Sequence, residues 1–255
     1  MRLNDLNAVL DETQVELFSP FKQMLCARLN VPYQVSDKGR REDFGNLPDP
    51  PFLVEIKFDG ERFQIHYDSA RPSDEKFRFF SRSGIDHTSN FKSTLTHRLM
   101  PKVKSTCSSF ILDGEMMAYR KSTGGFTHKG QNIDVRKMKP DDPEHCPAFV
   151  AFDIVYYNGR CFTNVPLQER LELMHEAVEE EAGVITLSQV KTLDSKELIL
   201  EELNEAVDDF QEGLIVKQLN TVYEIGKRAQ TWLKIKPEVR HGLLYQYEMY
   251  VKRSN

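Results

Sequence analysis

The stretch that sets the expected fold is residues 52–67, FLVEIKFDGERFQIHY. Apolar and polar side chains alternate on both sides of Asp59-Gly60, a pattern typical of two strands joined by a two-residue hairpin turn. Such a hairpin places Lys57 opposite Arg62 on one face, and two cations directly opposite each other on a sheet repel. An anionic ligand between the two cations would relieve that repulsion. A surface hairpin with two solvated cations is the competing interpretation.

The rest of the chain mixes further strands with scattered helices. This mixture predicts an α+β fold with antiparallel sheets. The sequence has no βαβ rhythm and no glycine-rich phosphate loop, which argues against Rossmann and P-loop folds. Alternation predicts strands over 76–81, 110–119, 148–156, 213–219, 231–236 and 243–251, while the polar segment 36–51 is expected to be a loop. Helical spacing is present over 14–29, where Pro20 breaks it, and over 91–103, 166–182 and 194–209.

The composition is that of an ordinary globular chain, with 40% hydrophobic and 29% charged residues among 255. No apolar run reaches the length of a membrane span, and no secretory segment opens the chain. The four cysteines are widely spaced and form no CxxC pair, which argues against a disulfide framework or structural zinc and indicates a reducing compartment. The net charge of −5 argues mildly against nucleic-acid binding, although a local basic stripe can lie on an acidic body.

Three more segments carry charged side chains within apolar strands. A turn inside a meander is the ordinary explanation for the first, and a solvated strand edge explains the lysine pair of the last. None of the three is specific by itself. The segments are 112–115 with Glu115, 212–217 with Glu212 and Lys217, and 231–236 with Lys234 and Lys236 on one face.

Taken in order, these segments resemble the motifs of covalent nucleotidyltransferases, and of ATP-dependent DNA ligases in particular. Residues 57–62, KFDGER, are similar to the lysine motif KxDGxR, and five later segments follow in the family's order. The resemblance covers residues 18–237 and implies an α+β, ATP-grasp-like nucleotidyltransferase fold with two antiparallel sheets flanked by helices. Gln23 departs from the pattern, because proline usually stands there, which affects a local turn. The five later segments are 79–84, 113–115, 151–154, 212–217 and 232–237.

Within this superfamily, the chain is most similar to the eukaryotic DNA ligase IV subfamily. Residues 114–119, 129–138 and 232–238 carry this likeness. It implies a role in double-strand break repair by end joining and a nuclear location. It also implies an end-joining scaffold protein as a partner, bound outside this chain.

The resemblance implies a role for each matched position. Lys57 would attack the α-phosphate of ATP and carry AMP as a phosphoramidate. The backbone at Glu55 and Ile56 would read the adenine edge. Phe152 and Ile215 would pack on the two faces of the ring, and ordinary core packing is the alternative for both. The other implied roles are ribose binding by Arg62 and Glu115, phosphate binding by Lys217, Lys234 and Lys236, metal binding by Glu115 and Glu212, support by Asp153, and contact of Arg82 with the 5′-phosphate of a nick.

This set of residue types is chemically coherent. A lysine amine is almost entirely protonated at neutral pH, and neighbouring cations and desolvation favour its neutral, nucleophilic form. The same cations, with Mg²⁺, stabilise the charge on phosphates during transfer. Nearby carboxylates oppose this effect unless a metal ion neutralises them, so ATP and Mg²⁺ are the implied cofactors.

The resemblance divides the chain into a leading segment 1–17, an adenylation domain 18–240 and the start of a link, 241–255. We expect the OB-fold domain beyond that link and an N-terminal DNA-binding domain to be missing, so the chain would bind nucleotide without sealing nicks. Nicked or broken DNA and these absent domains would be its partners.

Two alternatives stay open for the function of the chain. One is an RNA ligase or mRNA capping guanylyltransferase, and the other is a docking domain that keeps the fold without the chemistry.

Overall fold

The computed structural model describes residues 15–32, 47, 49–127 and 133–238. These residues form two compact units, each assembled from three segments of the chain. The chain passes from the second unit into the first directly after Lys57. The first unit comprises the described residues of Met1–Leu25, Phe58–Gln189 and Leu219–Ala229, and the second those of Cys26–Lys57, Val190–Gln218 and Gln230–Asn255.

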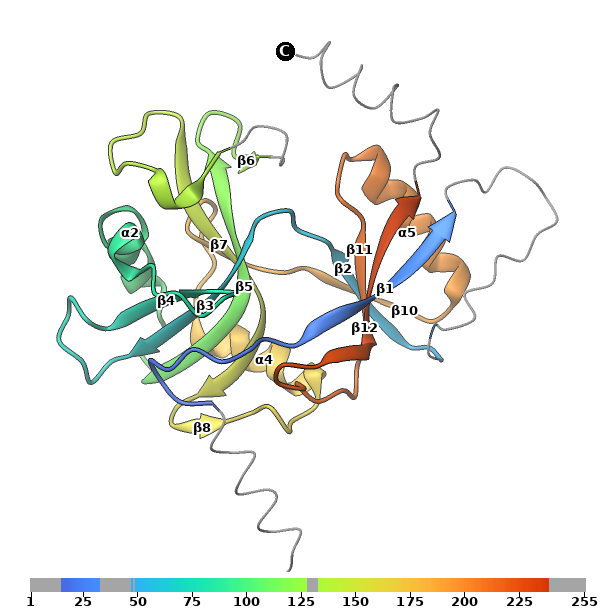
Figure 1. Cartoon of the computed structure of the whole chain (residues 1–255), viewed down its shortest axis with the longest axis horizontal. Coiled ribbons are helices and arrows are strands. Elements are labelled where there is room, and N and C mark those ends of the chain that lie inside the picture. The colour runs from blue at the N-terminus through green and yellow to red at the C-terminus, as the bar shows by residue number, and fades with distance from the viewer. Residues whose placement is uncertain (1–14, 33–46, 48, 128–132, 239–255) are drawn as a thin grey trace, which may run out of the picture. The chain divides into compact units, whose positions relative to one another are not determined.

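Within the described residues, the first unit is built around a seven-stranded sheet (Figure 1). Its main path runs β4-β3-β5-β7-β8, with β6 beside β5 and β9 beside β7. The β7–β9 pair is parallel and the other pairs are antiparallel. The strands are β3 (Glu61–Asp68), β4 (Phe77–Ser81), β5 (Ser109–Arg120), β6 (Gly125–Phe126), β7 (His145–Tyr157), β8 (Arg160–Cys161) and β9 (Ile185–Leu187).

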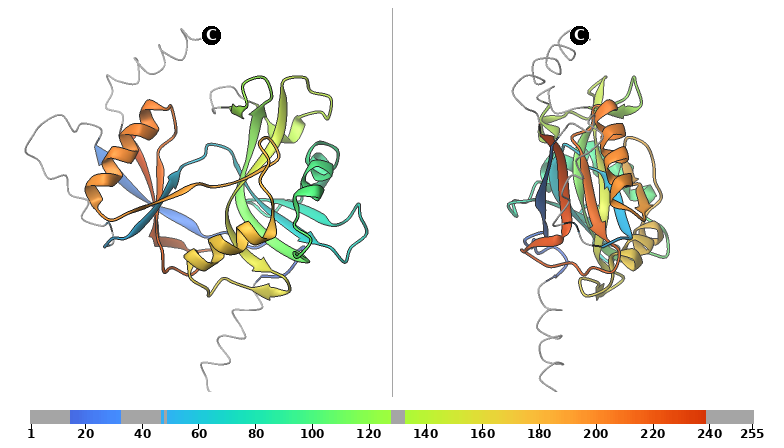
Figure 2. Two further views of the ribbon diagram at one scale, coloured as in Figure 1. Left: turned by 180° about the vertical axis from the view of Figure 1, so that it is seen from behind. Right: turned by 90° about the vertical axis from the view of Figure 1, so that its right-hand side faces the viewer.

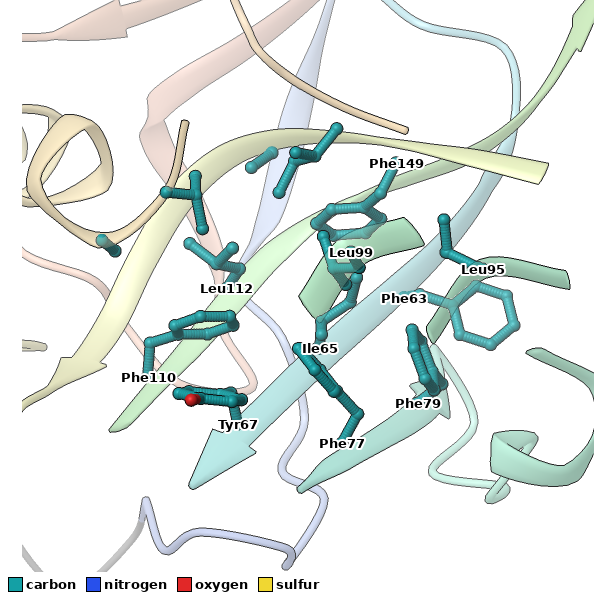
Figure 3. Close-up of a cluster of buried hydrophobic side chains, with 14 of the residues drawn as sticks. Phe63, Ile65, Tyr67, Phe77, Phe79, Leu95, Leu99, Phe110, Leu112 and Phe149 are labelled. Atoms are coloured by element: carbon teal, nitrogen blue, oxygen red, sulfur yellow. The ribbon is translucent and has the colours of Figure 1, made fainter. Parts of the chain in front are cut away.

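One face of this sheet carries an aromatic core. Phe63, Ile65 and Tyr67 alternate along β3 and are at most 5% exposed. The Tyr67 and Phe110 rings stack with their centroids 5.1 Å apart, and Figure 3 shows them among rings from β4 and side chains of the neighbouring helical turns. The helical elements of this unit are α2 (Thr88–Phe91), η1 (Lys92–Thr96), α3 (His97–Leu99), η2 (Met100–Lys102), η4 (Val135–Lys137) and α4 (Leu167–Ala177).

In the described part of the second unit, a five-stranded sheet runs in the order β1-β12-β11-β2-β10. Helix α5 (Lys196–Asp208) begins at Ser195, whose hydroxyl accepts a hydrogen bond from the Leu198 amide. The helix covers one face of the sheet (Figure 2), and its Ile199 and Leu203 pack against apolar side chains of β2, β11 and β12. The strands are β1 (Leu25–Pro32), β2 (Phe52–Ile56), β10 (Val190–Leu193), β11 (Leu214–Gln218) and β12 (Arg228–Glu238).

The α+β prediction, with antiparallel sheets flanked by helices, is confirmed. The predicted loop 36–51 lies mostly outside the described residues, and the predicted strand 243–251 lies wholly outside them. No helix in the described segments has the length and apolar character needed to cross a bilayer. The predicted strands over 76–81, 110–119, 148–156, 213–219 and 231–236 are β4, β5, β7, β11 and β12, and the predicted helices over 91–103 and 194–209 are the turns from α2 to η2 and helix α5.

The predicted hairpin between residues 52–58 and 62–67 is wrong. β2 lies between β11 and β10 in the second unit, whereas β3 lies between β4 and β5 in the first. Asp59-Gly60 instead belongs to the segment that connects β2 to β3. Gly60 is required there, because a Cβ would collide with the Met117 sulfur and the Met116 carbonyl oxygen.

Two helix predictions also need correction. Helical spacing over 14–29 does not produce a helix, because the strand β1 starts at Leu25 and places Ala27 and Leu29 against the second core. The helix predicted over 166–182 ends early, at Ala177. The next residue, Val178, is extended with φ of −137° and forms a bridge with Val103.

Candidate active site

Lys57 follows β2, and its ammonium group lies on the carboxylate of Glu212. The backbone amide of Lys57 donates to the carbonyl of Gly213 at 2.9 Å, which ties this segment to the start of β11. Gly213 has a φ of +138°, and a Cβ there would collide with the carbonyl oxygen of Ile235. Glycine is therefore required next to Glu212. Lys236 of β12 binds the other oxygen of the same carboxylate.

Glu212 thus accepts hydrogen bonds from two cations. Burial raises its pKa, but the hydrogen bonds and charges of Lys236 and Lys57 outweigh that effect, so the pKa lies below the usual glutamate value. An ionised carboxylate of this kind is a weak base that holds both amines in place. The Lys57 side chain is 19% exposed and that of Lys236 is 35% exposed, so a ligand can reach both.

The strand register places the predicted residues of this unit on one face of the sheet. Ile215 of β11 lies opposite Glu55 of β2 and Lys234 of β12, and directly opposite residues point to the same side. Residues two positions away along each strand share that side. Their immediate neighbours, including Ile56, point to the other side, toward the core under α5. We call the first side the site face, and its residues are Glu55, Lys57, Ile215, Lys217, Trp232, Lys234 and Lys236.

A buried ion pair lies in the middle of the site face. Lys217 Nζ donates to Glu55 Oε1 at 2.7 Å, and the two side chains are 1% and 4% exposed. The same ammonium group lies 4.3 Å from the centre of the Trp232 ring, which is cation–π distance. The sequence predicted Lys217 as a phosphate ligand. The structure adds that a carboxylate and an indole fix its position.

In the first unit, Arg62, Glu115 and Phe152 lie together. Arg62 of β3 stands opposite Glu115 of β5, and its guanidinium carbon lies 5.1 Å from the centre of the Phe152 ring. Arg62 also forms a two-point ion pair with Asp113, at 3.0 and 2.5 Å. Asp113 is completely buried and accepts a further hydrogen bond from the Tyr223 hydroxyl at 2.5 Å. Asp113 and Tyr223 therefore position the arginine that the sequence predicted to bind ribose.

Sequence reasoning missed Tyr223 and the role of Asp113. Asp113 stands inside a recognised motif, but its partner lies 110 residues farther along the chain, where no motif marks it. Burial and the Asp113 carboxylate raise the pKa of Tyr223 well above its usual value, so its hydroxyl remains a donor. Asp153 is also completely buried and pairs with Arg170 at 2.8 Å, an arrangement compatible with the supporting role expected for it.

Arg82 directly follows β4, and its side chain is exposed. Its backbone amide donates to the Arg62 carbonyl at 3.0 Å, so β3 and β4 fix where the arginine leaves the sheet. A solvent-facing guanidinium in this place is free to meet a ligand phosphate.

The two carboxylates predicted to bind a metal, Glu115 and Glu212, belong to different units. Within the described residues, no three His, Cys, Asp or Glu side chains are grouped closely enough to hold a metal ion. Mg²⁺ commonly takes one or two carboxylates and completes its shell with water and substrate phosphates. Glu212 can supply one such carboxylate, because its lowered pKa keeps it ionised.

The sequence matches a family model described as the ATP dependent DNA ligase domain over residues 34–236. The chain is 32% identical to DNA ligase 4 of Gallus gallus and to that of Homo sapiens, covering 98% of this chain and 26% of each relative. DNA ligase 4 of Dictyostelium discoideum is 31% identical over 94% of this chain and 22% of the relative. The chain therefore spans about a quarter of the length of these relatives.

Solved structures of DNA ligases share the fold of this chain. The mycobacterial DNA ligase D complexed with ATP and MES matches with a TM-score of 0.60 and 21% identity, over 87% of this chain and 62% of that one. The Chlorella virus DNA ligase-adenylate matches with a TM-score of 0.52 and 16% identity, over 84% and 68%. At these identities the likeness shows a shared fold. Because the family model covers most of the sequence, the chain belongs to the ATP-dependent DNA ligase domain family.

Proposed function

We propose that this chain carries out the first chemical step of ATP-dependent ligation, the transfer of AMP from ATP to Lys57. The Lys57 amine gives up a proton and bonds to the α-phosphorus, the bond from that phosphorus to its bridging oxygen breaks, and pyrophosphate leaves. The product is a lysyl-AMP phosphoramidate. The observation that carries the proposal is the binding of Lys57 and Lys236 to the two oxygens of one carboxylate, that of Glu212.

This arrangement suits a nucleophile beside phosphates. Glu212 fixes the Lys57 amine on the site face, where part of the side chain remains accessible. Lys234 and Lys236 lie on the same face and would stabilise negative charge on the phosphates during transfer. Since the lowered pKa of Glu212 makes it a poor proton acceptor, we assign it a positioning role and assign the proton to solvent.

The nucleoside contacts follow from the two groups of residues. In the second unit, Ile215 and the backbone at Glu55 and Ile56 would contact adenine. In the first unit, the Phe152 ring would stack on adenine, and the Arg62 guanidinium lies 5.1 Å from the centre of that ring. The remaining proposed contacts are ribose with Arg62 and Glu115, and phosphates with Lys217, Lys234 and Lys236.

We propose Glu212 of the second unit and Glu115 of the first as separate candidate ligands of Mg²⁺, because oxygen donors are the ligands this ion prefers. When bound, the ion supplies positive charge that offsets the charge of the triphosphate.

The later steps of ligation are also part of the proposal, because the chain spans about a quarter of its relatives' length. AMP would pass from Lys57 to the 5′-phosphate of a DNA break, and exposed Arg82 would contact that phosphate. The similarity to DNA ligase 4 supports double-strand break repair by end joining in the nucleus. An OB-fold domain, a DNA-binding domain and an end-joining scaffold protein would then act with this chain.

Incubation with Mg²⁺ and α-labelled ATP or GTP, followed by denaturing electrophoresis, tests the proposal. We expect label from ATP on the wild type and none on Lys57→Arg, which keeps a cation beside Glu212 but lacks a nucleophilic amine. Lys191→Arg is the matched control, because Lys191 is an exposed lysine paired with Glu202 on α5. Label from GTP alone would favour a capping guanylyltransferase. If the chain takes up no label and calorimetry detects no ATP binding, the result would favour a docking domain.

A further inference from the structure

A basic cavity lies within the first unit, and none of its lining residues belongs to the adenylation chemistry proposed above. Its volume is about 310 Å³. The walls come from the helical turns of η1 and α3, the end of β5, the start of β7 and the turn before β9. The side chains that matter here are His97, Arg98, Tyr119, Lys121 and Lys139.

The lining is positively charged. It has four basic side chains, and no carboxylate stands among the described residues that line it. Arg98 donates three hydrogen bonds, to the carbonyl oxygens of Thr94, Pro147 and Gly183, which hold the guanidinium in place without cancelling its charge. Clefts lined by one sign of charge concentrate ions of the opposite sign.

The nearby carboxylates have hydrogen-bond or ion-pair partners outside the cavity, although the charge of Lys121 also acts on the Asp142 carboxylate. Lys121 Nζ donates to the Asp142 carbonyl oxygen at 2.5 Å, whereas the Asp142 carboxylate accepts the backbone amides of His145 and Glu144. Glu144 pairs with Arg120 at 3.4 Å. In the portion of the chain that the structure describes, neither Lys121 nor Lys139 forms an ion pair. The positive charge of the cavity is therefore available to a ligand.

The backbone at Gly183 completes the wall. This glycine has a φ of +75°, and a Cβ on it would come within 2.7 Å of the Tyr119 ring. Glycine therefore allows the turn to approach Tyr119 while its carbonyl oxygen holds Arg98. A fixed guanidinium thus lies beside two exposed, adaptable lysines and an exposed imidazole.

We propose that this cavity binds a single backbone phosphate of a nucleic acid, separately from the ATP site. The cavity has room for a phosphate group, and its choice of ligand rests on the basic side chains that line it. An arginine held in place and flexible lysines are the usual donors to phosphate. The choice of nucleic acid as the source rests on the proposed function. A chain with a net charge of −5 must hold a polyanion through local basic sites such as this one.

The test measures binding of a fluorescent nicked duplex by anisotropy across a range of salt concentrations. The variant is Lys121→Gln with Lys139→Gln, because both lysines are exposed and neither belongs to the buried core. The control is Lys104→Gln with Lys227→Gln, which removes the same charge from exposed positions of the same unit outside the cavity. We expect on the order of tenfold weaker DNA binding for the variant at low salt. The binding constant should also fall less steeply with salt, so that the slope of its logarithm against log salt is about 1 less negative than in the wild type. The control should keep the wild-type slope.

Further measurements separate the alternatives. Labelling of Lys57 by ATP should be the same in both double variants as in the wild type. If the wild type takes up no label, the adenylation proposal fails, whereas the proposal of a phosphate site in this cavity is unaffected. A wild-type slope for the cavity variant, or no DNA binding by the wild type, would overturn the nucleic-acid assignment. A variant that binds DNA normally but loses thermal protection by inorganic phosphate would assign the cavity to free phosphate. The same result with a polyglutamate peptide would assign it to an acidic protein segment.

Discussion

Lys217→Met removes an ammonium that is 1% exposed and deprives the buried Glu55 carboxylate of its contact at 2.7 Å. The ion pair lies within the second unit, between β2 and β11, so its loss directly affects that sheet. Breaking one partner of a buried pair costs about 3–5 kcal/mol, because the remaining charge stays buried. At about 2–4 °C per kcal/mol for a chain near this size, the melting temperature should fall by roughly 6–20 °C.

The double variant Lys217→Met with Glu55→Leu should be much less affected. Replacing both charges by apolar side chains removes the desolvation cost together with the attraction, and such replacements are often close to neutral. Glu55→Leu alone should resemble Lys217→Met alone, since it leaves the ammonium buried. We therefore expect the double variant to be more stable than the sum of the singles predicts by at least about 2 kcal/mol.

Trp232 makes the measurement specific. It is the single tryptophan of the chain, it is 1% exposed, and its ring lies 4.3 Å from the Lys217 ammonium group. Its emission wavelength during urea unfolding therefore reports on the sheet that contains the pair. Single variants that cost less than about 1 kcal/mol, or costs that add without coupling, would show that the two charges do not meet as described.

Three further predictions concern the buried polar groups. Tyr223→Phe should cost about 1.5–3 kcal/mol of unfolding free energy, because it removes a hydrogen bond to the buried charge of Asp113. Tyr67→Phe, at a buried tyrosine of the first core, should cost less, and equal costs in urea unfolding would contradict the assigned bond. Burial lowers the pKa of His66 to about 3, against the opposing charge of Asp86, so the unfolded chain takes up the proton first as the pH falls below about 6.5. Stability should therefore drop by about 1.4 kcal/mol between pH 7.5 and 5.5 from this group, and His66→Gln should flatten that part of the profile. Because the pKa of Glu212 is lowered, its ionised form stabilises the fold above about pH 4.3, and the advantage of wild type over Glu212→Gln should shrink in urea unfolding as the pH falls to 3.5.

The strands themselves could be predicted from sequence, because alternation is a local property. Their pairing could not. The stretch around Asp59-Gly60 has the composition of a hairpin turn, yet β2 joins β11 and β10 while β3 joins β4 and β5. The cation opposition expected between Lys57 and Arg62 is therefore absent. Each cation has its own carboxylate, Glu212 for one and Asp113 for the other.

The candidate site was predicted to the extent that its residues fall within motifs. Strand parity correctly placed Lys234 and Lys236 on one face, and the register adds Ile215 and Glu55 to it. A sequence motif identifies a residue, but it does not indicate which distant side chains that residue contacts in the fold. The bond between Tyr223 and Asp113 depends on contact between distant segments, which no local pattern records.

Peptide mapping of the adduct is the most direct test of the central claim. After incubation with ATP and Mg²⁺, the chain would be digested, and the AMP-bearing peptide sequenced by mass spectrometry before and after mild acid, which cleaves phosphorus–nitrogen bonds. The account predicts one acid-labile AMP on the peptide that contains Lys57, and none on that peptide from Lys57→Arg. An AMP that survives acid, or one located on a different lysine while Lys57 stays unmodified, would contradict it.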